Sequence, residues 1–367
     1  MERSTPRYDR FFLIVLAIIV SLGFIIFLSA SMGLIARNGA GFSSVVLKQV
    51  GVGIIGGVLA AYIFSRVRYS SIRSFAFFLF LFSLILTSLV FVPVIGFSHG
   101  GAHRWLSIFG FSFQPAEVLK FAYVLYLAAW LASVKKKVTT WQFGLLPFLV
   151  ITAVAILPLV FQPDMGTSLV ITITGFAMYL VSGARWRDIG IVVLIGFIGL
   201  AFIAWQKPYI RDRLETFIHP QENSLSESYQ VQQALIAIGS GNMFGRGFGQ
   251  SVQKFNYLPE PIGDSVFAVF AEEFGFIGST VLVLLFLLLA LRGLKIAVHA
   301  PDAYGRLLAS GLVILILVQS FFNIAAMLGV APLSGMPLLF VSQGGSALLL
   351  ALAETGIILN ISKYSRI

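Results

Sequence analysis

The sequence of 367 residues contains no cysteine and few charges. Without cysteine the chain can form neither disulfides nor a thiolate metal site. Only 11% of its residues are charged, against about 25% in an average soluble domain. A soluble protein of this length could not cover its surface with so few charges, whereas a protein that faces lipid needs no more. The composition therefore argues against a soluble globular protein.

Hydrophobic residues make up 58% of the chain, and its mean hydropathy is +0.94. Basic residues outnumber acidic ones by 25 to 15, which gives a net charge of +10. In a soluble protein this balance would suggest nucleic-acid binding. Here the basic residues fall in short segments between apolar runs. We therefore predict that they determine topology and that the chain has no nucleic-acid partner; an additional role in binding anionic lipid stays open.

Ten apolar stretches approach the length of about 20 residues that a membrane helix needs. The first is too long for the apolar core of a signal peptide, and no A-x-A cleavage pattern follows it, so we expect a membrane helix there. The sequence predicts an all-α polytopic membrane protein, with a single transmembrane domain over 1–367. The predicted spans are 11–32, 45–65, 74–95, 115–134, 143–161, 165–183, 188–205, 264–291, 305–328 and 339–361.

Lysines and arginines support these spans, because cytoplasmic loops of membrane proteins carry an excess of these residues. With the N-terminus inside, each of the six inner segments carries at least two of them. Sixteen of the 25 basic residues fall in these segments. One helix more or fewer would disturb this alternation, so we predict that both termini lie in the cytoplasm.

The longest connection, 206–263, follows the seventh predicted span and lies on the outer side. Loops of this length are usually functional or disordered. Its aromatic and apolar residues favour an ordered extracytoplasmic loop. Part of it predicts a short helix at the membrane interface, with an apolar face and glutamines opposite. The apolar residues are Val231, Ala234, Leu235 and Ile238, and the glutamines are Gln230, Gln232 and Gln233.

Ionisable groups at membrane depth are costly and mark functional candidates. Glu117 and Lys120 are three residues apart on the fourth predicted helix and can pair. They form either a charged cavity wall, with Lys120 facing an anionic substrate, or an internal ion pair. Glu272 and Glu273 lie deeper in the eighth helix and need partners, for which Lys120 is one candidate. A structural role is favoured for these two residues. Glu354 completes this set in the last predicted helix.

Two aspartates stand at predicted helix starts. Asp164 follows Pro163 in a tight turn, where capping of the next helix is the favoured interpretation. Asp264 follows Pro259 and Pro261 and opens the eighth helix at its outer mouth. A carboxylate there could cap the helix or, with water on one side, act as a general base.

Two weaker patterns predict neither a nucleotide site nor a metal site. The glycine-rich stretch 245–249 looks phosphate-binding, but no strand precedes it, so a hairpin is favoured. His99 and His103 could share a helix face, but the glycines beside them favour a loop. From the residues alone, the chain is an enzyme or a carrier with an outward-facing site for an anionic, lipid-linked substrate.

Four groups of motifs resemble the SEDS family, the polytopic proteins of shape, elongation, division and sporulation that include FtsW and RodA. They span nearly the whole chain in family order. The stretch QKFNYLPE at 253–260 resembles the division branch, FtsW, more than the elongation branch, RodA. At 262–263 the chain has Ile-Gly where the family commonly has His-Thr. The motifs are HRWL and FQPAEVLK between 103 and 120, QPDMGT at 162–167, QALIAIGSG, GRG, YLPE and AEEFGFIG between 233 and 278, and GVAPLSGMP and SQGGS between 329 and 346.

The resemblance implies a peptidoglycan glycosyltransferase that polymerises lipid II at the outer face of the bacterial cytoplasmic (inner) membrane during cell division. By family analogy Asp264 is the catalytic general base of an inverting reaction. Glu272 and Glu273 are expected to be structural residues of the cavity. Positive charge for the leaving pyrophosphate would come from basic side chains, with Arg104 and Lys120 preferred, or from a divalent cation. The expected substrate-binding residues are Arg104, Glu117, Lys120, Asp164, Arg246, Glu260 and Ser342.

Two other functions stay open at this stage. A lipid II flippase would need access from both faces, but Asp264 lies at the rim, whereas transporter sites lie near the midplane. A non-catalytic scaffold would leave the ordered loop and the buried charges unexplained. The resemblance also implies a class B penicillin-binding protein as the transpeptidase partner, with other divisome or elongasome membrane proteins. No cofactor is certain, and a divalent cation, Mg or Mn, stays open.

Overall fold

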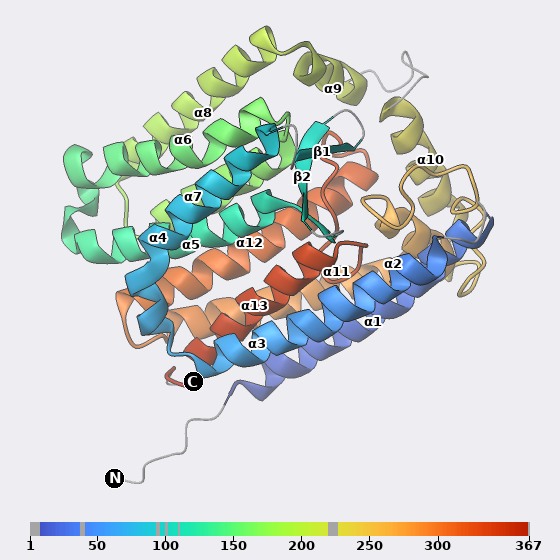
Figure 1. Ribbon diagram of the computed structural model, residues 1–367, viewed down its shortest axis with the longest axis horizontal. Helices are drawn as coiled ribbons and strands as arrows, with labels where there is room; N and C mark the ends of the chain where they lie inside the picture. The colour runs from blue at the N-terminus through green and yellow to red at the C-terminus, as the bar shows by residue number, and fades with distance from the viewer. Residues whose placement is uncertain are drawn as a thin grey trace.

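The computed structural model describes residues 8–36, 41–92, 96–99, 102–108, 111–218 and 227–365. Long helices run side by side in one bundle, and a small sheet and α10 lie toward the right of the view in Figure 1. The helices are α1 (Arg10–Ala36), α2 (Phe42–Lys48), α3 (Gly57–Arg66), α4 (Tyr69–Ser88), α5 (Pro115–Val134), α6 (Leu146–Phe161), α7 (Met165–Val181), α8 (Trp186–Gln206), α9 (Pro208–Ile218), α10 (Glu227–Ser240), α11 (Val266–Val298), α12 (Ala303–Met327) and α13 (Gly345–Ser362).

Nine helical spans in the described part of the chain are long and apolar enough to cross a membrane. The second of them joins α2 and α3 through the π-helical stretch Gln49–Gly56. Helix α7 is apolar but shorter than these nine, with 17 residues, and it corresponds to the predicted span 165–183. Each of the ten predicted spans corresponds to one of these helices, and the predicted polytopic helical fold is confirmed.

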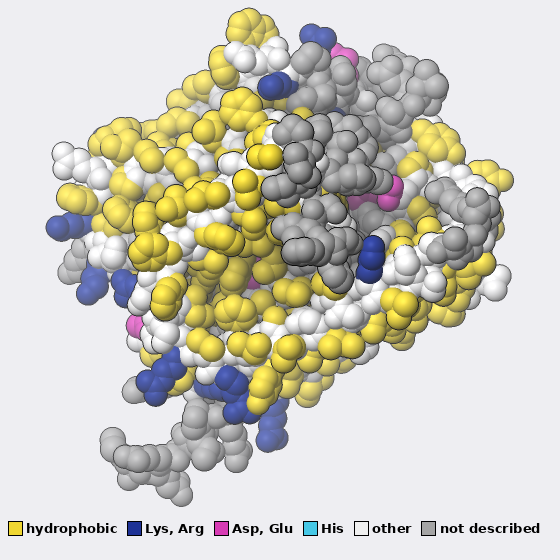
Figure 2. Space-filling model, viewed as in Figure 1, with side chains coloured by type: hydrophobic (Ala, Val, Ile, Leu, Met, Phe, Trp, Pro, Cys, Tyr) yellow, Lys and Arg dark blue, Asp and Glu magenta, His cyan; other side chains and the backbone are white. Residues whose placement is uncertain are grey.

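The two ends of the described chain meet at one end of the bundle. The ammonium nitrogen of Lys363 lies 4.2 Å from the centre of the Tyr8 ring. The backbone amide of Asp9 donates a hydrogen bond of 3.1 Å to Oγ of Ser362. Lysine and arginine side chains gather along the same edge, at the lower left of Figure 2. We call this the basic end; that it faces the cytoplasm stays a prediction.

A small antiparallel sheet between α4 and α5 adds to the helical fold. Its strands β1 (Gly96–His99), β2 (Ala102–Ile108) and β3 (Phe111–Phe113) pair in chain order. The sequence predicts only a loop around 98–102. His99 ends β1 and His103 lies in β2, so the two histidine positions do not share a helix face.

The chain between α12 and α13, residues 328–344, forms a connecting segment that is not helical. The sequence predicts a helix from 339, whereas α13 begins at Gly345. Pro337 and the positive φ of Phe340, 66°, keep this apolar stretch out of the helix. The carbonyl oxygen of Phe340 lies against Gly23 of α1, where a side chain would not fit. Irregular backbone at membrane depth is tolerated here because the surrounding helices bury it.

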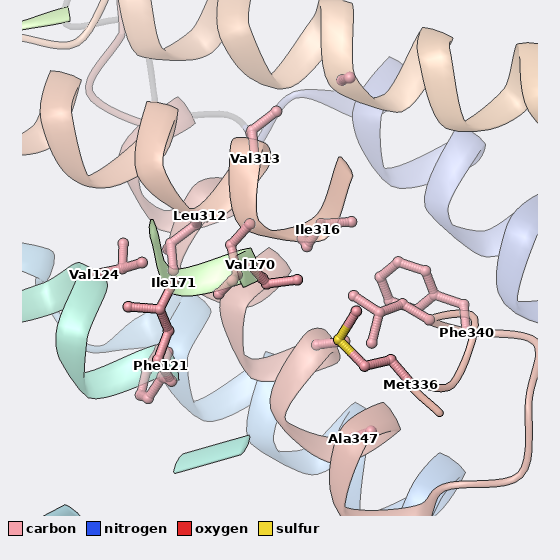
Figure 3. Close-up of a cluster of buried hydrophobic side chains, with 14 of the residues drawn as sticks. Phe121, Val124, Val170, Ile171, Leu312, Val313, Ile316, Met336, Phe340 and Ala347 are labelled. Carbon is pink, nitrogen blue, oxygen red and sulfur yellow. The ribbon is translucent and has the colours of Figure 1, made fainter. Parts of the chain in front are cut away.

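The core lies among α5, α7, α12 and the connecting segment, as Figure 3 shows. Helix α13 has 78% of its most apolar stretch buried, whereas α8 has only 11% and lies at the periphery. The labelled core residues are Phe121 and Val124 of α5, Val170 and Ile171 of α7, Leu312, Val313 and Ile316 of α12, Met336 and Phe340 of the connecting segment, and Ala347 of α13.

Candidate active site

Asp264 lies one turn after the two prolines and directly before α11, whose N-cap is Ser265. The chain turns sharply there because the amides of Gly263 and Ser265 both donate to the carbonyl oxygen of Glu260, at 3.0 and 3.3 Å. The Asp264 carboxylate does not cap the helix. Within the described residues, no amide of the first turn of α11 donates to it. The carboxylate therefore stays available for chemistry.

Gln230 of α10 holds the Asp264 side chain. Its Nε2 donates to Oδ1 of Asp264 at 3.1 Å and to Oγ of Ser265 at 2.9 Å. Burial raises the pKa of the Asp264 carboxyl to about 6, the bond from Gln230 opposes this rise, and the nearby Glu260 carboxylate adds to it. The sequence predicts Gln230 on the polar face of this helix, opposite its apolar residues, and gives it no partner. The structure instead turns it toward Asp264, a partner that lies 34 residues away in sequence.

Asn323 of α12 fixes the backbone of the site. Its Nδ2 donates to the carbonyl oxygens of Asp264 and Met336, both at 2.8 Å. One amide group therefore ties the start of α11 to the connecting segment. Asn323 is buried. The backbone around Asp264 is thus held in place by a buried side chain.

Glu117 and Lys120 pair on α5 as predicted, with 2.8 Å between Oε1 and Nζ. The Lys120 ammonium also donates to Oε1 of Gln319 on α12. Nε2 of Gln319 in turn donates to the carbonyl oxygen of Pro337 at 3.3 Å. Both charged side chains are buried. The pair is therefore linked to the same connecting segment as Asp264.

Arg104 and Asp164 lie at the turn between α6 and α7. The Arg104 guanidinium, on β2, donates to the carbonyl oxygens of Gln162 and Pro163. Asp164 caps α7 by accepting from the amide and the hydroxyl of Thr167, at 3.2 and 2.9 Å. The predicted capping role of Asp164 is confirmed. Contact of either residue with a substrate stays a prediction.

Glu272 and Glu273 bind the loop before α11 rather than Lys120. Glu273 forms an ion pair of 2.7 Å with Nζ of Lys254, and both side chains are fully buried. The Lys254 ammonium also donates to Oγ of Ser29 on α1, at 3.1 Å. Sequence reasoning missed Lys254, although a lysine beside the YLPE motif could have been paired with the unpartnered glutamates. The buried pair therefore joins α1, the loop and α11.

The Glu272 carboxylate accepts hydrogen bonds from the same loop. Ser251 Oγ and the amides of Val252 and Gln253 donate to its carboxylate at 2.6, 3.1 and 3.2 Å. Arg246 adds an ion pair in which Nε lies 3.5 Å from Oε1 of Glu272, and 42% of the arginine side chain remains exposed. These contacts hold the loop from 246 to 254 on α11.

The remaining predicted site residues differ in exposure. The Ser342 hydroxyl is buried and accepts from the amide of Leu338 at 2.8 Å, within the connecting segment. Glu260 is exposed, with a positive φ of 44°. The described residues contain no group of three or more histidine, aspartate or glutamate side chains that could hold a metal ion. The site is a single partly buried carboxylate at the meeting point of α10, α11, α12 and the connecting segment.

Comparisons with known proteins agree with this architecture. A family profile described as cell cycle protein, which covers FtsW, RodA and SpoVE, matches residues 9–367. Stage V sporulation protein E of Bacillus subtilis is 40% identical over 313 residues, which cover 84% of this chain and 85% of that protein. The probable peptidoglycan glycosyltransferase FtsW of Geobacter sulfurreducens is 36% identical over 360 residues, with 98% and 96% covered.

Solved structures of the same fold cover nearly the whole chain. One is a chain from a peptidoglycan synthase complex that coordinates polymerization and crosslinking. It has a TM-score of 0.79 at 28% identity, with 98% of both chains covered. The rod shape determining protein RodA of Thermus thermophilus has a TM-score of 0.71 at 28% identity, also with 98% of both chains covered. The chain therefore belongs to the family of FtsW, RodA and SpoVE cell cycle proteins, the SEDS family that its motifs resemble.

Proposed function

We propose that the chain is a peptidoglycan glycosyltransferase that polymerises lipid II during cell division. The observation that carries this proposal is the Asp264 carboxylate, which is held by Gln230, has no cationic partner in the described residues and has a pKa raised to about 6. The names of the FtsW relatives support the activity and the division branch. The position of Asp264, directly before a membrane-spanning helix, suits a substrate anchored in lipid.

Asp264 acts as the general base in a single displacement. The 4-hydroxyl of the acceptor sugar attacks the anomeric carbon of the donor, and the bond from that carbon to the pyrophosphate oxygen breaks. Asp264 takes the hydroxyl proton as the new glycosidic bond forms, and the pyrophosphate leaves with the bonding electrons. The α-linkage of the donor becomes β. A pKa of about 6 makes Asp264 a stronger base than an ordinary aspartate while it remains ionised at neutral pH.

Positive charge must stabilise the departing pyrophosphate. The motifs favour Arg104 and Lys120 for this role, but both side chains already have partners within the protein. Arg104 donates to carbonyl oxygens of the turn, and Lys120 donates to Glu117 and Gln319. Arg246 has a partly exposed guanidinium with one ion pair. We therefore assign the main contact with pyrophosphate to Arg246. Arg104, Lys120 and their neighbours Glu117, Asp164 and Ser342 shape the wall that the substrate meets.

A divalent cation would supply further charge neutralisation at the pyrophosphate. Two carboxylates, Asp264 and Glu260, lie near enough to interact electrostatically. One exposed carboxylate would suit a magnesium ion that takes its remaining ligands from phosphates and water. Of the two, the exposed Glu260 would hold it, because Asp264 must stay free to accept a proton.

The partner and the location follow from the same function. A class B penicillin-binding protein would cross-link the new strands, and the structural likeness to a chain of a peptidoglycan synthase complex supports this partner. We place the chain in the bacterial inner membrane with the basic end in the cytoplasm, as the distribution of lysine and arginine favours. Asp264 then faces the outside.

Polymerisation of purified lipid II tests the proposal. Wild type is assayed with magnesium or manganese, alone and with its transpeptidase, beside Asp264→Ala and a control, Glu215→Gln, which removes an exposed carboxylate on α9. We expect glycan ladders from wild type and from the control and none from Asp264→Ala. Ladders from folded Asp264→Ala would refute its role as the base. No ladder from folded wild type in any condition would favour a flippase or a scaffold instead.

A further inference from the structure

A cavity of about 540 Å³ opens at the basic end, far along the bundle from Asp264. It lies where the last turns of α5 and α7 meet the first turn of α12. Lys135 and Arg306 supply its charged wall, with Thr139 and Ser182 beside them. Apolar side chains form the rest, including Leu131 and Leu307. The cavity is therefore amphipathic, with two cations on one side and hydrocarbon on the other.

The two cations are available to a ligand. Lys135 and Arg306 are both exposed, and neither forms an ion pair with another residue that the structure describes. The acidic residue nearest in sequence, Asp302, is directed elsewhere, because its carboxylate accepts from the amide of Gly305 at 2.6 Å and the hydroxyl of Tyr69 at 2.8 Å. Neither cation is therefore paired with a carboxylate in the described part of the chain.

The cavity lies at the depth of lipid headgroups. Trp141 and Trp186 begin the helical segments that leave this end of the bundle, and their side chains are 52% and 85% exposed. Exposed tryptophans at helix ends mark the membrane interface. A ligand in the cavity can therefore place its polar group among interfacial residues and its apolar part along the helices.

The size argues for more than a free anion. The cavity of about 540 Å³ is lined by residues of three helices and is open to the outside. Inorganic phosphate would fill only a small part of this volume and would leave the apolar wall uncovered. A phosphate that carries a glycerol group and acyl chains would meet both walls.

We propose that this cavity is a binding site for an acidic phospholipid, whose phosphate contacts Lys135 and Arg306 and whose acyl chains leave the cavity past Val181, which is 47% exposed. Basic pockets between transmembrane helices bind anionic lipid headgroups in this way. The site does not depend on the glycosyltransferase activity, since it lies at the other end of the bundle and shares no residue with the Asp264 site.

Native mass spectrometry of the delipidated full-length protein tests this site. Phosphatidylglycerol, phosphatidylcholine and inorganic phosphate are titrated separately against wild type, the double variant Lys135→Gln with Arg306→Gln, and a control that carries Arg68→Gln with Arg187→Gln. The control removes the same charge from exposed arginines that do not line the cavity. Since each basic residue near an anionic lipid contributes about a factor of five, we expect phosphatidylglycerol to bind the double variant roughly 25-fold more weakly than wild type and the control.

Three results would overturn the proposal. They are equal binding of phosphatidylglycerol to wild type and the double variant, equal binding of phosphatidylcholine and phosphatidylglycerol to wild type, and complete displacement of the lipid by inorganic phosphate at similar concentration. The second and third need only wild type, so they decide the matter even where the double variant does not fold.

Discussion

Three carboxylates lie within ten residues at and just before the start of α11, in two contrasting environments. Glu272 and Glu273 are buried and surrounded by donors, with Lys254 and Arg246 as cationic partners. Asp264 is only partly buried and accepts from a neutral amide, Gln230. A paired, fully bonded carboxylate holds the loop in place, whereas an unpaired one retains basicity. The two environments thus separate the carboxylates that hold the site in place from the one that we propose acts in it.

Lys254→Met removes the cation from the buried ion pair with Glu273 and should have the largest effect on stability. It leaves the Glu273 carboxylate buried without its cation, which costs about 3–5 kcal/mol in the free energy of unfolding. We expect a large fall in the thermal unfolding midpoint in detergent. The control Lys295→Met removes an exposed lysine from α11, the helix of Glu273, and should leave the unfolding midpoint unchanged.

The double variant Lys254→Met with Glu273→Gln sharpens this result. Because it removes the uncompensated charge, it should recover much of the stability that Lys254→Met loses. A single variant as stable as wild type would show that the buried ion pair does not hold the loop.

Gln230→Ala alters the catalytic side and should have an intermediate effect. The amide stabilises the ionised carboxylate, so its loss raises the pKa of Asp264 further. A general base must be deprotonated, so the polymerisation rate of wild type should increase as the pH passes about 6. In the variant, the same increase should occur at a pH about one unit higher. Rates measured from pH 5 to 8, with Gln233→Ala on the same helix as control, check this. If the increase in rate occurs at the same pH in the variant as in wild type, or at a lower pH, the role of Gln230 is contradicted.

Asp164→Ala should have the smallest effect. Its carboxylate is bonded like Glu272 but has no cationic partner in the described residues, since it accepts only from Thr167 and Gln114. Loss of a helix cap costs typically about 1 kcal/mol of stability. A slightly lower unfolding midpoint with ladders still formed is the expected result. Complete loss of polymerisation in folded protein would instead assign Asp164 to substrate binding.

Local features were predictable from the sequence because their partners are close along the chain. Ten apolar runs identified ten spans, and the pairing of Glu117 with Lys120 and the capping by Asp164 each involve residues three positions apart. The start of α13 was not predictable from apolarity, since residues 336–341 are mostly apolar but the chain turns at Phe340 and packs against Gly23 of α1.

The contacts that make the site were not predictable, because they join distant segments. Gln230 reaches Asp264 across 34 residues, and Lys254 reaches Ser29 across 225. Amphipathic spacing assigns Gln230 to the polar face of its helix but cannot identify the residue that this side chain contacts. The small sheet at 96–113 was missed for a related reason, since its strands are short and their pairing depends on the helices on either side.

Polymerisation of lipid II by Asp264→Asn, measured beside thermal unfolding of the same preparation, tests the central claim most directly. The amide keeps the shape and the bond partners but cannot accept the proton, and loss of a general base costs roughly 10²–10⁴-fold in rate. We predict no glycan ladder, with an unfolding midpoint equal to or above that of wild type, because the variant no longer buries a charge that has no cationic partner. Ladders at the wild-type rate from Asp264→Asn, or loss of activity together with loss of folding, would contradict the assignment of Asp264 as the residue that acts rather than one that holds the structure.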